Sequence, residues 1–599
     1  MAEEAFMQRT TNCGALTKAD NGKTVILNGW VHRDRNHGAL HFINLRDRYG
    51  ITQIVIDDDA SAELQQTAKD LHLEYCIAVQ GVVRLRPDSM INQEMPTGEI
   101  EVKAQRIDIL SKCAPLPFQI DDDEQVPNED IRLKYRFLDL RTKGMQQRLK
   151  LRHEFIRSIR NYLSDRDFYE IETPTMIKST PEGARDFLVP SRIWPGKFYA
   201  LPQSPQLYKQ LLMVGGMDKY FQIARCYRDE DARGDRQLEF TQLDVEMSFV
   251  KRDDVLLLME QLFNHVFKEV IDYQLPEHFR RITYYDALNT YGCDKPDLRF
   301  KVEMKDLDVL ASKSTFSAFK EVLSNGGHVK ALCAPMTEGV DFSRKYIDSL
   351  TETAKVYGAK GLAWAKVGSN DTLIGGVSKF FAGLEKELVS TFEAKEGDMI
   401  LFVAHENWKK CCNILGAVRN RLGKDLNLIK PHCFEFCWVI DFPLFEYNEE
   451  EGHWEAAHHM FSMPQVEYIP TLESDTGKVL GDLYDLVCNG YECASGSIRI
   501  HDVELQKRIF RICNYPEDLA LQKFGFLLNA FKYGPPPHGG IAPGIDRLVM
   551  IMSEQTSIHE VIAFPKNTVG VSPMDDCPAE VEQKQLDELH IKVVVPPQK

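Results

Sequence analysis

Apolar and polar residues alternate most regularly between Phe221 and Phe249, and this pattern predicts two antiparallel β-strands joined by a charged loop. The arms FQIARCYR and EFTQLDVEMSF both alternate, and the polar stretch RDEDARGDRQ connects them. Arg228 ends the first arm, whereas Asp244 and Glu246 lie two residues apart on the second and therefore share one face of the strand. A hairpin of this kind is most often a solvated surface feature, so this pattern alone indicates no function.

A second pattern far downstream changes that interpretation. In GIAPGIDRLVMIM (Gly540–Met552), a Gly-rich strand leads into an apolar helix that carries Arg547 near its start. Arg228 and Arg547 thus both stand at the ends of strand elements, a combination more specific than a single Gly-rich motif. Together they indicate a site for a negatively charged ligand.

Five short segments between about Val25 and Leu110 combine β-branched residues with strand-like alternation. Five strands in about 90 residues fit an OB-fold β-barrel, in which strands two and three carry the ligand face. Arginines there can contact phosphates, an aromatic ring can stack on a base, and a glutamine can read a base edge. The residues assigned to this face are His32, Arg33, Arg35, His37, Phe42, Arg46, Arg48 and Gln53. Their clustering favours a nucleic-acid ligand.

Helical spacing appears after a Pro- and Asp-rich passage. A buried helix stripe is predicted to end near Asp165, before a short strand that closes on Pro174. The stretch QSPQLYKQLLM predicts a helix that opens at Gln206 with Lys209 in its first turn, where anions are favoured. The residues of the helix stripe are Phe155, Ile156, Ile159, Tyr162 and Leu163.

Strand-like and helix-like patterns alternate from about Arg299 to Val418 and predict an α+β unit. Because the Gly540–Met552 pattern lies beyond it, this unit is an insertion. From His432, the β-rich run FEFCWVIDFPLFEY indicates a central antiparallel strand. The stretch STPEGARDFLVP, which contains Glu182, has the glycine and charge content of a mobile loop.

Composition narrows the class of protein. A chain of 599 residues with 43% hydrophobic and 27% charged residues is typical of a soluble protein with roughly three to five domains. No apolar run is long enough for a membrane span and no apolar segment follows the start MAEEAFMQRT, so we expect neither a membrane span nor a secretory signal. The 14 cysteines form no CxxC pair, which favours reduced thiols and a cytoplasmic location. The net charge of −17 argues against a generally basic surface but leaves room for a local basic face.

The strings TPEGARD, QSPQLYKQ, RCYRDEDARGDRQLEFTQ, GYECASGSIRIH and GIAPGIDR, in this order, resemble the bacterial-type aspartyl-tRNA synthetases, a family of class II aminoacyl-tRNA synthetases, along essentially the whole chain. The resemblance implies a multidomain α+β protein, and a homodimer whose seam contains the helix stripe. It divides the chain into an OB-fold anticodon-binding domain (1–114), a hinge (115–145), an antiparallel catalytic core in two parts (146–298 and 421–565), a GAD-type insertion (299–420) and a C-terminal extension (566–599).

The reaction implied by the resemblance uses ATP and Mg²⁺. The aspartate α-carboxylate attacks the α-phosphorus of ATP and expels pyrophosphate, so a fixed arginine at the α-phosphate should help most. That residue would be Arg228, while Arg547 would clamp the γ-phosphate. Asp485 and Glu492 would share the metal ion. The implied ATP-binding set is Arg228, Asp229, Glu230, Gln237, Glu492, Gly544, Ile545, Asp546 and Arg547.

The aspartate pocket is expected around Arg499. It lies on the apolar strand SGSIRIH, where an unpaired guanidinium would be costly, so it should bind an anion. In the family this residue holds the side-chain carboxylate of the substrate. The implied aspartate-binding set is Glu182, Gln206, Lys209, Arg228, Asp244, His458 and Arg499. His459 is the alternative to His458, which we favour as the ligand contact.

Several alternatives stay open. Lysyl and asparaginyl relatives share the same plan, an aspartate–ammonia ligase makes the same adenylate, and an RNA-binding paralogue could have lost the activation step. A separate hypothesis concerns the tRNA. In the family, a histidine at the place of His37 and a small residue at the place of Gly81 accompany charging of tRNA-Asn as well as tRNA-Asp. An amidotransferase would then act downstream.

Overall fold

The computed structural model describes residues 6–37, 40–120, 127–180 and 183–595. The chain divides into two compact units. The first comprises Met1–Leu149 with Ala563–Asn567 and Val571–Cys577, and the second comprises Lys150–Ile562 with Thr568–Gly570 and Pro578–Lys599. Among the helices of the described ranges, none combines the length and the apolar character needed to cross a bilayer.

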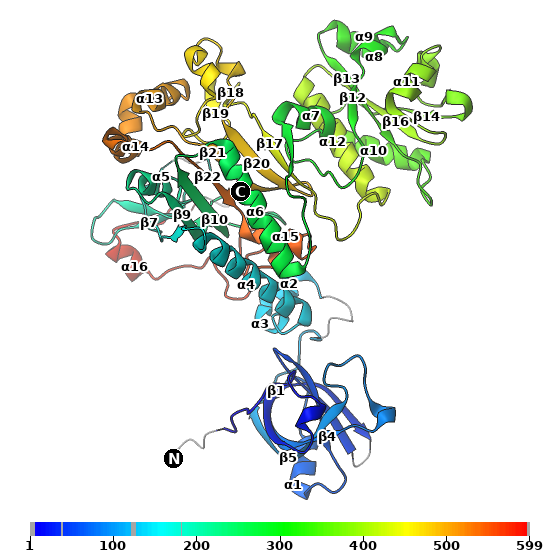
Figure 1. Cartoon of the computed structure of the whole chain (residues 1–599), viewed down its shortest axis with the longest axis vertical. Helices are drawn as coiled ribbons and strands as arrows, with labels where there is room; N and C mark the ends of the chain where they lie inside the picture. The colour runs from blue at the N-terminus through cyan, green and yellow to red at the C-terminus, as the bar shows by residue number, and fades with distance from the viewer. Residues whose placement is uncertain (1–5, 38–39, 121–126, 181–182, 596–599) are drawn as a thin grey trace. The chain divides into compact units, whose positions relative to one another are not determined.

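The first unit contains the predicted five-stranded barrel, and the OB-fold prediction is confirmed (Figure 1). The strands close in the order β1-β2-β3-β5-β4, with β3 and β5 parallel and the other pairs antiparallel. Alternate residues such as Val31, Ile43 and Ile54 are fully buried inside. The strands are β1 (Thr24–His37), β2 (Leu40–Asp47), β3 (Gly50–Ile56), β4 (Cys76–Leu85) and β5 (Ile100–Ser111), and α1 (Ala62–Lys69) packs beside them.

The stretch expected to be a hinge is partly helical. Two short helices, α2 (Glu129–Lys134) and α3 (Arg136–Asp139), precede the long helix α4 (Lys143–Ser164). Asp139 accepts hydrogen bonds from Arg132 Nε at 2.9 Å and from Arg136 Nη1. Arg136 Nε also donates to the carbonyl oxygen of Ala563 at 3.0 Å. Buried charge-assisted bonds therefore hold these helices in place.

The second unit is built on an eight-stranded sheet in the order β11-β17-β20-β21-β22-β10-β9-β6. All neighbours are antiparallel except the two edge pairs, β11–β17 and β6–β9. The predicted antiparallel core and the β9–β10 hairpin are thereby confirmed. The strands are β6 (Tyr169–Glu170), β9 (Lys219–Tyr227), β10 (Glu239–Ser248), β11 (Arg280–Thr283), β17 (Phe436–Ile440), β20 (Leu483–Cys488), β21 (Tyr491–Ile498) and β22 (His538–Pro543).

The run after His432 does not form one central strand. It is interrupted at Asp441, whose φ of 58° ends β17, and it resumes as β18 (Phe445–Asn448) in a hairpin with β19 (His453–Ala456). β17 itself lies next to the edge strand β11. Another two-stranded hairpin joins β7 (Leu188–Pro190) and β8 (Phe198–Ala200).

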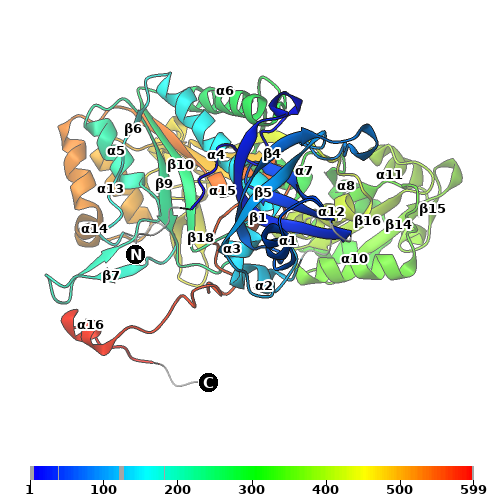
Figure 2. The ribbon, with the colours of Figure 1, turned by 90° about the horizontal axis from the view of Figure 1, so that it is seen from below.

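Helices cover both faces of the large sheet, and strand residues alternate between two cores. Trp438 and Leu486 belong to the core beneath α4, α6 (Arg252–Ile271) and α15 (Ile545–Met552). Their neighbours Val439 and Val487 belong to the core beneath α5 (Gln206–Val214), α13 (Val503–Ile512) and α14 (Glu517–Ala530). Figures 1 and 2 show α4 and α6 side by side, and the rings of Tyr162 and His265 meet there at 5.0 Å.

The inserted segment forms its own five-stranded sheet, in the order β12-β13-β16-β14-β15 (green in Figure 1). Arg419 is fully buried and donates to the carbonyl oxygens of Val302, Asp297 and Phe300, which fixes the start of this segment. Its elements, with the flanking α7 and the C-terminal α16, are α7 (Tyr284–Tyr291), β12 (Met304–Asp306), α8 (Asp308–Lys313), α9 (Ser317–Ser324), β13 (His328–Ala334), α10 (Arg344–Val356), β14 (Ala363–Val367), β15 (Leu373–Ile374), α11 (Glu385–Phe392), β16 (Met399–His405), α12 (Trp408–Asp425) and α16 (Gln583–Glu588).

Candidate active site

A cavity of about 450 Å³ lies on the sheet face opposite the α4–α6 core. Along β10, Leu243 and Val245 are fully buried in that core, so Asp244 and Glu246 point to the other face. The predicted residues that line the cavity are Gln206, Lys209, Arg228, Glu230, Gln237, Asp244, His458, Glu492, Arg499, Gly544, Asp546 and Arg547. Elements far apart in the sequence thus bring most of the predicted site together.

Four charged side chains form a buried cluster beside this cavity. Lys209 Nζ lies 3.2 Å from Asp244 Oδ1 and 3.4 Å from Glu246 Oε2. Arg499 Nε donates to Glu246 Oε1 at 3.0 Å, and Nη2 donates to Glu246 Oε2 at 3.3 Å. All four residues are at most 1% exposed. The formal charges of the two cations and the two carboxylates cancel.

The anion that Arg499 was expected to need is supplied by the chain itself, by Glu246. Sequence reasoning placed Glu246 on the correct face of β10 but gave it no role. The Nη1 group of Arg499 donates to Ser497 Oγ and to His459 Nε2, both at 2.7 Å. With the two bonds to Glu246, these contacts use four of the five N–H groups of the guanidinium. One N–H of Nη2 remains for a ligand.

Gly540 makes the contact between Glu246 and Arg499 possible. It lies on β22, between β10 and β21, and pairs with Glu246 on one side and Ser497 on the other. A Cβ atom at this position would come within 2.0 Å of Glu246 Oε2. The missing side chain therefore leaves the space through which Glu246 reaches toward Arg499.

The pKa shifts in this cluster have opposite directions. Complete burial raises the pKa of Asp244, although Lys209 opposes the shift. Burial also disfavours ionisation of Glu246, but Arg499 and then Lys209 outweigh it and hold its pKa below the usual range. Burial, followed by Arg499, holds the pKa of His459 well below its usual value. The neutral His459 ring can therefore accept the hydrogen bond from Arg499.

His458 and His459 both line the cavity, but their surroundings differ. Nε2 of His458 lies 3.6 Å from Asp485 Oδ2. Burial opposes protonation of His458, yet Asp485 outweighs it and the pKa of His458 is raised. Its Nδ1 atom has no partner among the described residues, whereas His459 is held by Arg499. This arrangement favours His458 as the ring that is free to contact a ligand.

Arg228 and Arg547 have donor groups to spare. The guanidinium of Arg228 lies 5.0 Å from the ring centre of Phe240, and its buried Nε has no partner within the described ranges. Arg547 donates through Nη1 to the carbonyl oxygen of Glu492 and through Nη2 to Asp235 Oδ2 at 3.2 Å. Its Nε is likewise without a partner in the described part of the chain. Buried, unsatisfied N–H groups that border a cavity favour an anionic ligand.

A β-bulge brings the two predicted metal ligands to one face. Asp485 pairs with Ser495, and two residues later Val487 pairs with Glu492 instead of Cys493. Without the extra residue, Glu492 would point to the opposite side of β21. Asp485 is 4% exposed, and its Oδ1 has no partner among the residues described. A pair of carboxylates with a spare buried oxygen fits a hard divalent cation.

The other predicted ligand-binding residues differ in their surroundings. Ile545 is fully buried in the core, so only its backbone faces a ligand. The Asp546 carboxylate accepts from Arg152 and from the backbone N–H of Thr241 at 2.8 Å, which anchors α15 to β10. Asp229 lies in a second, more open depression with Arg185 and Arg236. Glu182 lies outside the described residues.

In the barrel, a second bulge decides which side chains face outward. Val31 pairs with Leu45, but after His32 the register shifts and Arg33 pairs with Asn44. Without this bulge, Arg33 and Arg35 would share the inward face of Val31. The assignment of His32, Arg33, Arg35 and His37 to strands two and three was wrong, because all four lie on β1, of which His37 is the last residue. Arg48 lies on neither strand, since it falls in the turn between β2 and β3.

The remaining barrel candidates lie close to these arginines. Arg35 pairs with Phe42, and its Nη2 donates to Gln53 Oε1 at 3.4 Å. Gln53 Nε2 donates to Glu101 at 2.9 Å. Gly81 is buried on β4, where a Cβ would lie 2.3 Å from the carbonyl oxygen of Lys103, so packing alone requires glycine there. The side chain of His37 is outside what the structure describes.

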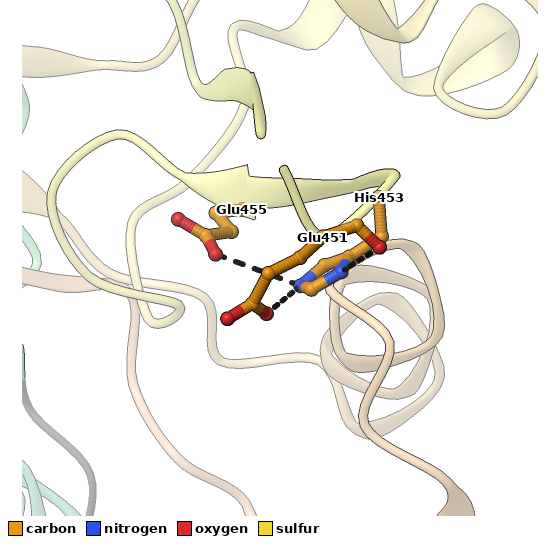
Figure 3. Close-up of side chains that lie close together, drawn as sticks. All are labelled: Glu451, His453 and Glu455. Carbon is orange, nitrogen blue, oxygen red and sulfur yellow. Dashed lines mark hydrogen bonds and ion pairs between the residues drawn. The ribbon is translucent and has the colours of Figure 1, made fainter. Parts of the chain in front are cut away.

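A separate group of possible metal ligands lies on the β18–β19 hairpin, formed by Glu451, His453 and Glu455 (Figure 3). His453 Nε2 is 3.7 Å from Glu451 Oε2 and 3.6 Å from Glu455 Oε1. Both carboxylates are largely exposed, at 65% and 49%. The three side chains contact one another directly, and we assign no metal to this group.

Comparison with known families identifies two matching regions. The profile described as tRNA synthetases class II (D, K and N) matches residues 128–568. The profile described as OB-fold nucleic acid binding domain matches residues 25–110. The chain is 62% identical over 588 residues to a Treponema denticola protein named aspartate–tRNA(Asp/Asn) ligase, covering 98% of this chain and 99% of that protein. A Macrococcus caseolyticus protein named aspartate–tRNA ligase is 48% identical and covers 98% of each chain.

Solved structures share the fold. A putative aspartyl-tRNA synthetase from Leishmania major has a TM-score of 0.59 at 20% identity, covering 95% of this chain and 96% of that one. An asparaginyl-tRNA synthetase from Pyrococcus horikoshii, complexed with asparaginyl-adenylate, has a TM-score of 0.57 at 19% identity, covering 94% and 98%. At these identities the likeness concerns the fold alone.

Proposed function

The chain belongs to the class II tRNA synthetases of the D, K and N group, and on that premise we propose that it attaches L-aspartate to tRNA through an aspartyl-adenylate made from ATP. The names of its relatives support aspartate as the amino acid. The observation in the structure that carries the proposal is the placement of Lys209 and Arg499 together beside one cavity.

The substrate carboxylate would bind the N–H groups that the buried cluster leaves over. Arg499 keeps one N–H of Nη2, and Lys209 keeps one of its three N–H donors after contacts with Asp244 and Glu246. Asp244 Oδ2 has no partner among the described residues, so it would accept from the substrate ammonium group together with Gln206. His458 would complete the pocket.

This distribution of donors favours aspartate over asparagine and lysine as the bound amino acid. An asparagine side chain would turn an amide N–H₂ toward at least one donor, and a lysine side chain would bring a cation to Lys209 and Arg499. Sites that leave polar groups unmatched reject an analogue by roughly 10⁴–10⁵-fold. An editing step is therefore not needed for asparagine.

The activation step depends on position and charge. The α-carboxylate of aspartate attacks the α-phosphorus of ATP, and negative charge grows on the phosphate oxygens. Arg228 would face the α-phosphate with its unpaired Nε, and Arg547 would hold the γ-phosphate. Glu230, Gln237 and Gly544, which line the cavity, with Asp229 and the backbone of Ile545 and Asp546, would seat the rest of the nucleotide.

Asp485 and Glu492 would hold Mg²⁺, since the bulge in β21 turns both to one face. The ion would supply neutralisation of the pyrophosphate charge.

The barrel would bind the anticodon. Replacing Phe42 by alanine should raise the KM for tRNA by an amount equivalent to about 1–3 kcal/mol, because a stacked base loses its aromatic partner. Aspartate-dependent ATP–pyrophosphate exchange, which needs no tRNA, should stay unchanged. The matched control is Leu110→Ala, an exposed apolar residue on β5 (37%). Equal effects of the two substitutions on tRNA charging would contradict the assignment.

We further propose that the protein works in the cytoplasm as a homodimer and charges tRNA-Asn as well as tRNA-Asp. Relatives whose names include Asp/Asn support the second tRNA. The decisive experiment supplies ATP, Mg²⁺ and labelled aspartate with each tRNA transcript separately. We expect aspartate on both tRNAs, which would imply an amidotransferase downstream. Charging of tRNA-Asp alone would reject the wider tRNA choice, and no charging at all would reject the function.

A further inference from the structure

Gln206 is linked through hydrogen bonds to Gln210 and, beyond it, to His538, two residues that do not line the cavity. We infer that Gln210 and His538 are positioning residues that turn the carbonyl oxygen of Gln206 toward the α-ammonium group of aspartate, an inference that rests on the proposed function. Gln210 and His538 are fully buried, and Gln206 is 7% exposed. Of the three, only Gln206 lines the cavity.

The direction of this hydrogen-bond relay is set at His538. Its Nδ1 lies 2.8 Å from the carbonyl oxygen of Pro536. A carbonyl oxygen can only accept, so Nδ1 carries the hydrogen. Burial lowers the pKa of His538, which keeps the ring neutral. The second ring nitrogen, Nε2, is therefore an acceptor.

The acceptor at His538 fixes both amides in turn. Gln210 Nε2 lies 3.2 Å from His538 Nε2 and must donate to it. The amide of Gln210 is thereby oriented, and its Oε1 accepts from Gln206 Nε2 at 3.1 Å. Gln206 thus uses its N–H₂ group in the relay. Its Oε1 atom has no partner among the described residues and is left for the cavity.

The orientation matters because an ammonium group needs acceptors. With the relay intact, the Gln206 oxygen adds to Asp244, whose Oδ2 is also without a partner in the described ranges. If the Gln206 amide turned over, its N–H₂ group would face the ammonium, replacing an attraction with a repulsion. Neither Gln210 nor His538 needs to touch the substrate to have this effect.

The test compares aspartate with succinate, which has both carboxylates but no ammonium group. Gln210→Met keeps the side-chain length and removes both polar atoms. We expect the KM for aspartate in ATP–pyrophosphate exchange to rise roughly 10- to 100-fold, the range for a hydrogen bond to a charged group. The KM for ATP and the inhibition constant of succinate should stay unchanged. The control is Leu207→Met on the same helix, 2% exposed in an apolar core.

Four outcomes besides the expected one are distinguished. Equal weakening of aspartate and succinate would show a general disturbance of the pocket and overturn the inference, as would an unchanged KM for aspartate. If Gln210→Met fails to fold, as judged by circular dichroism, His538→Phe must show the same selective loss. If the unmodified protein shows no aspartate-dependent exchange, the proposed function fails instead, and binding of the two ligands by calorimetry still tests the relay.

Discussion

Arg228→Lys is expected to lower the kcat of aspartate-dependent ATP–pyrophosphate exchange by about 10²–10³-fold, the usual cost of removing one donor from a developing oxyanion. A lysine keeps the charge but loses the planar fork that can bind two phosphate oxygens at once. The contact is made mainly in the transition state, so the KM for aspartate should change far less than kcat.

Arg225, three residues before Arg228, provides the control. Arg225 lies on β9, pairs with Glu239 at 2.5 Å and does not line the cavity. Arg225→Lys should therefore leave the exchange rate unchanged. A similar loss in both variants would point to disruption of the hairpin and would contradict the role given to Arg228.

The second large effect concerns Glu246. In Glu246→Gln the buried Arg499 loses its counter-ion, and breaking a buried ion pair on one side typically costs about 3–5 kcal/mol. We expect the free energy of unfolding at neutral pH to fall by about that amount, measured by urea unfolding of the two proteins. The KM for aspartate should rise as well, because Arg499 is no longer held in place.

The loss of stability in Glu246→Gln should depend on pH in a defined direction. The pKa of Glu246 is lowered in the folded protein, so its carboxylate stabilises the fold above the unfolded-state pKa. That contribution is lost as the pH falls through the lowered pKa. The difference in unfolding free energy between wild type and Glu246→Gln should thus be constant above pH of about 5 and shrink only in acid. Glu239→Gln, which removes an exposed partner of Arg225, should cost at most about 1 kcal/mol.

Local patterns predicted the elements well because they depend on neighbours in the sequence. The alternation around Asp244 gave both strands of the β9–β10 hairpin, and the stripe through Ile159 gave α4. The interruption at Asp441 was missed because a continuous apolar run conceals a residue with positive φ. The bulges at His32 and Cys493 were missed for a similar reason, since only the partner strand reveals the extra residue.

The candidate site was predicted where a charged residue stands on an apolar element. Arg499 is the best example, yet its partner Glu246 is 253 residues away, and no local pattern connects them. Gln210 and His538 carry no charge pattern at all, and their roles depend on the hydrogen-bond partners that folding provides. A helical spacing of four from Gln206 was the single sequence signal for Gln210.

Gly540 has a consequence for how variants of this protein should be interpreted. Its contribution is an empty volume between Glu246 on β10 and Arg499, the residue that follows β21. A change of one carbon atom there would separate Glu246 from Arg499 while leaving every ionisable group in the sequence intact. A substitution that looks conservative by charge and polarity can thus act as a deletion of an ion pair, and its effect would resemble that of a mutation on the neighbouring strand.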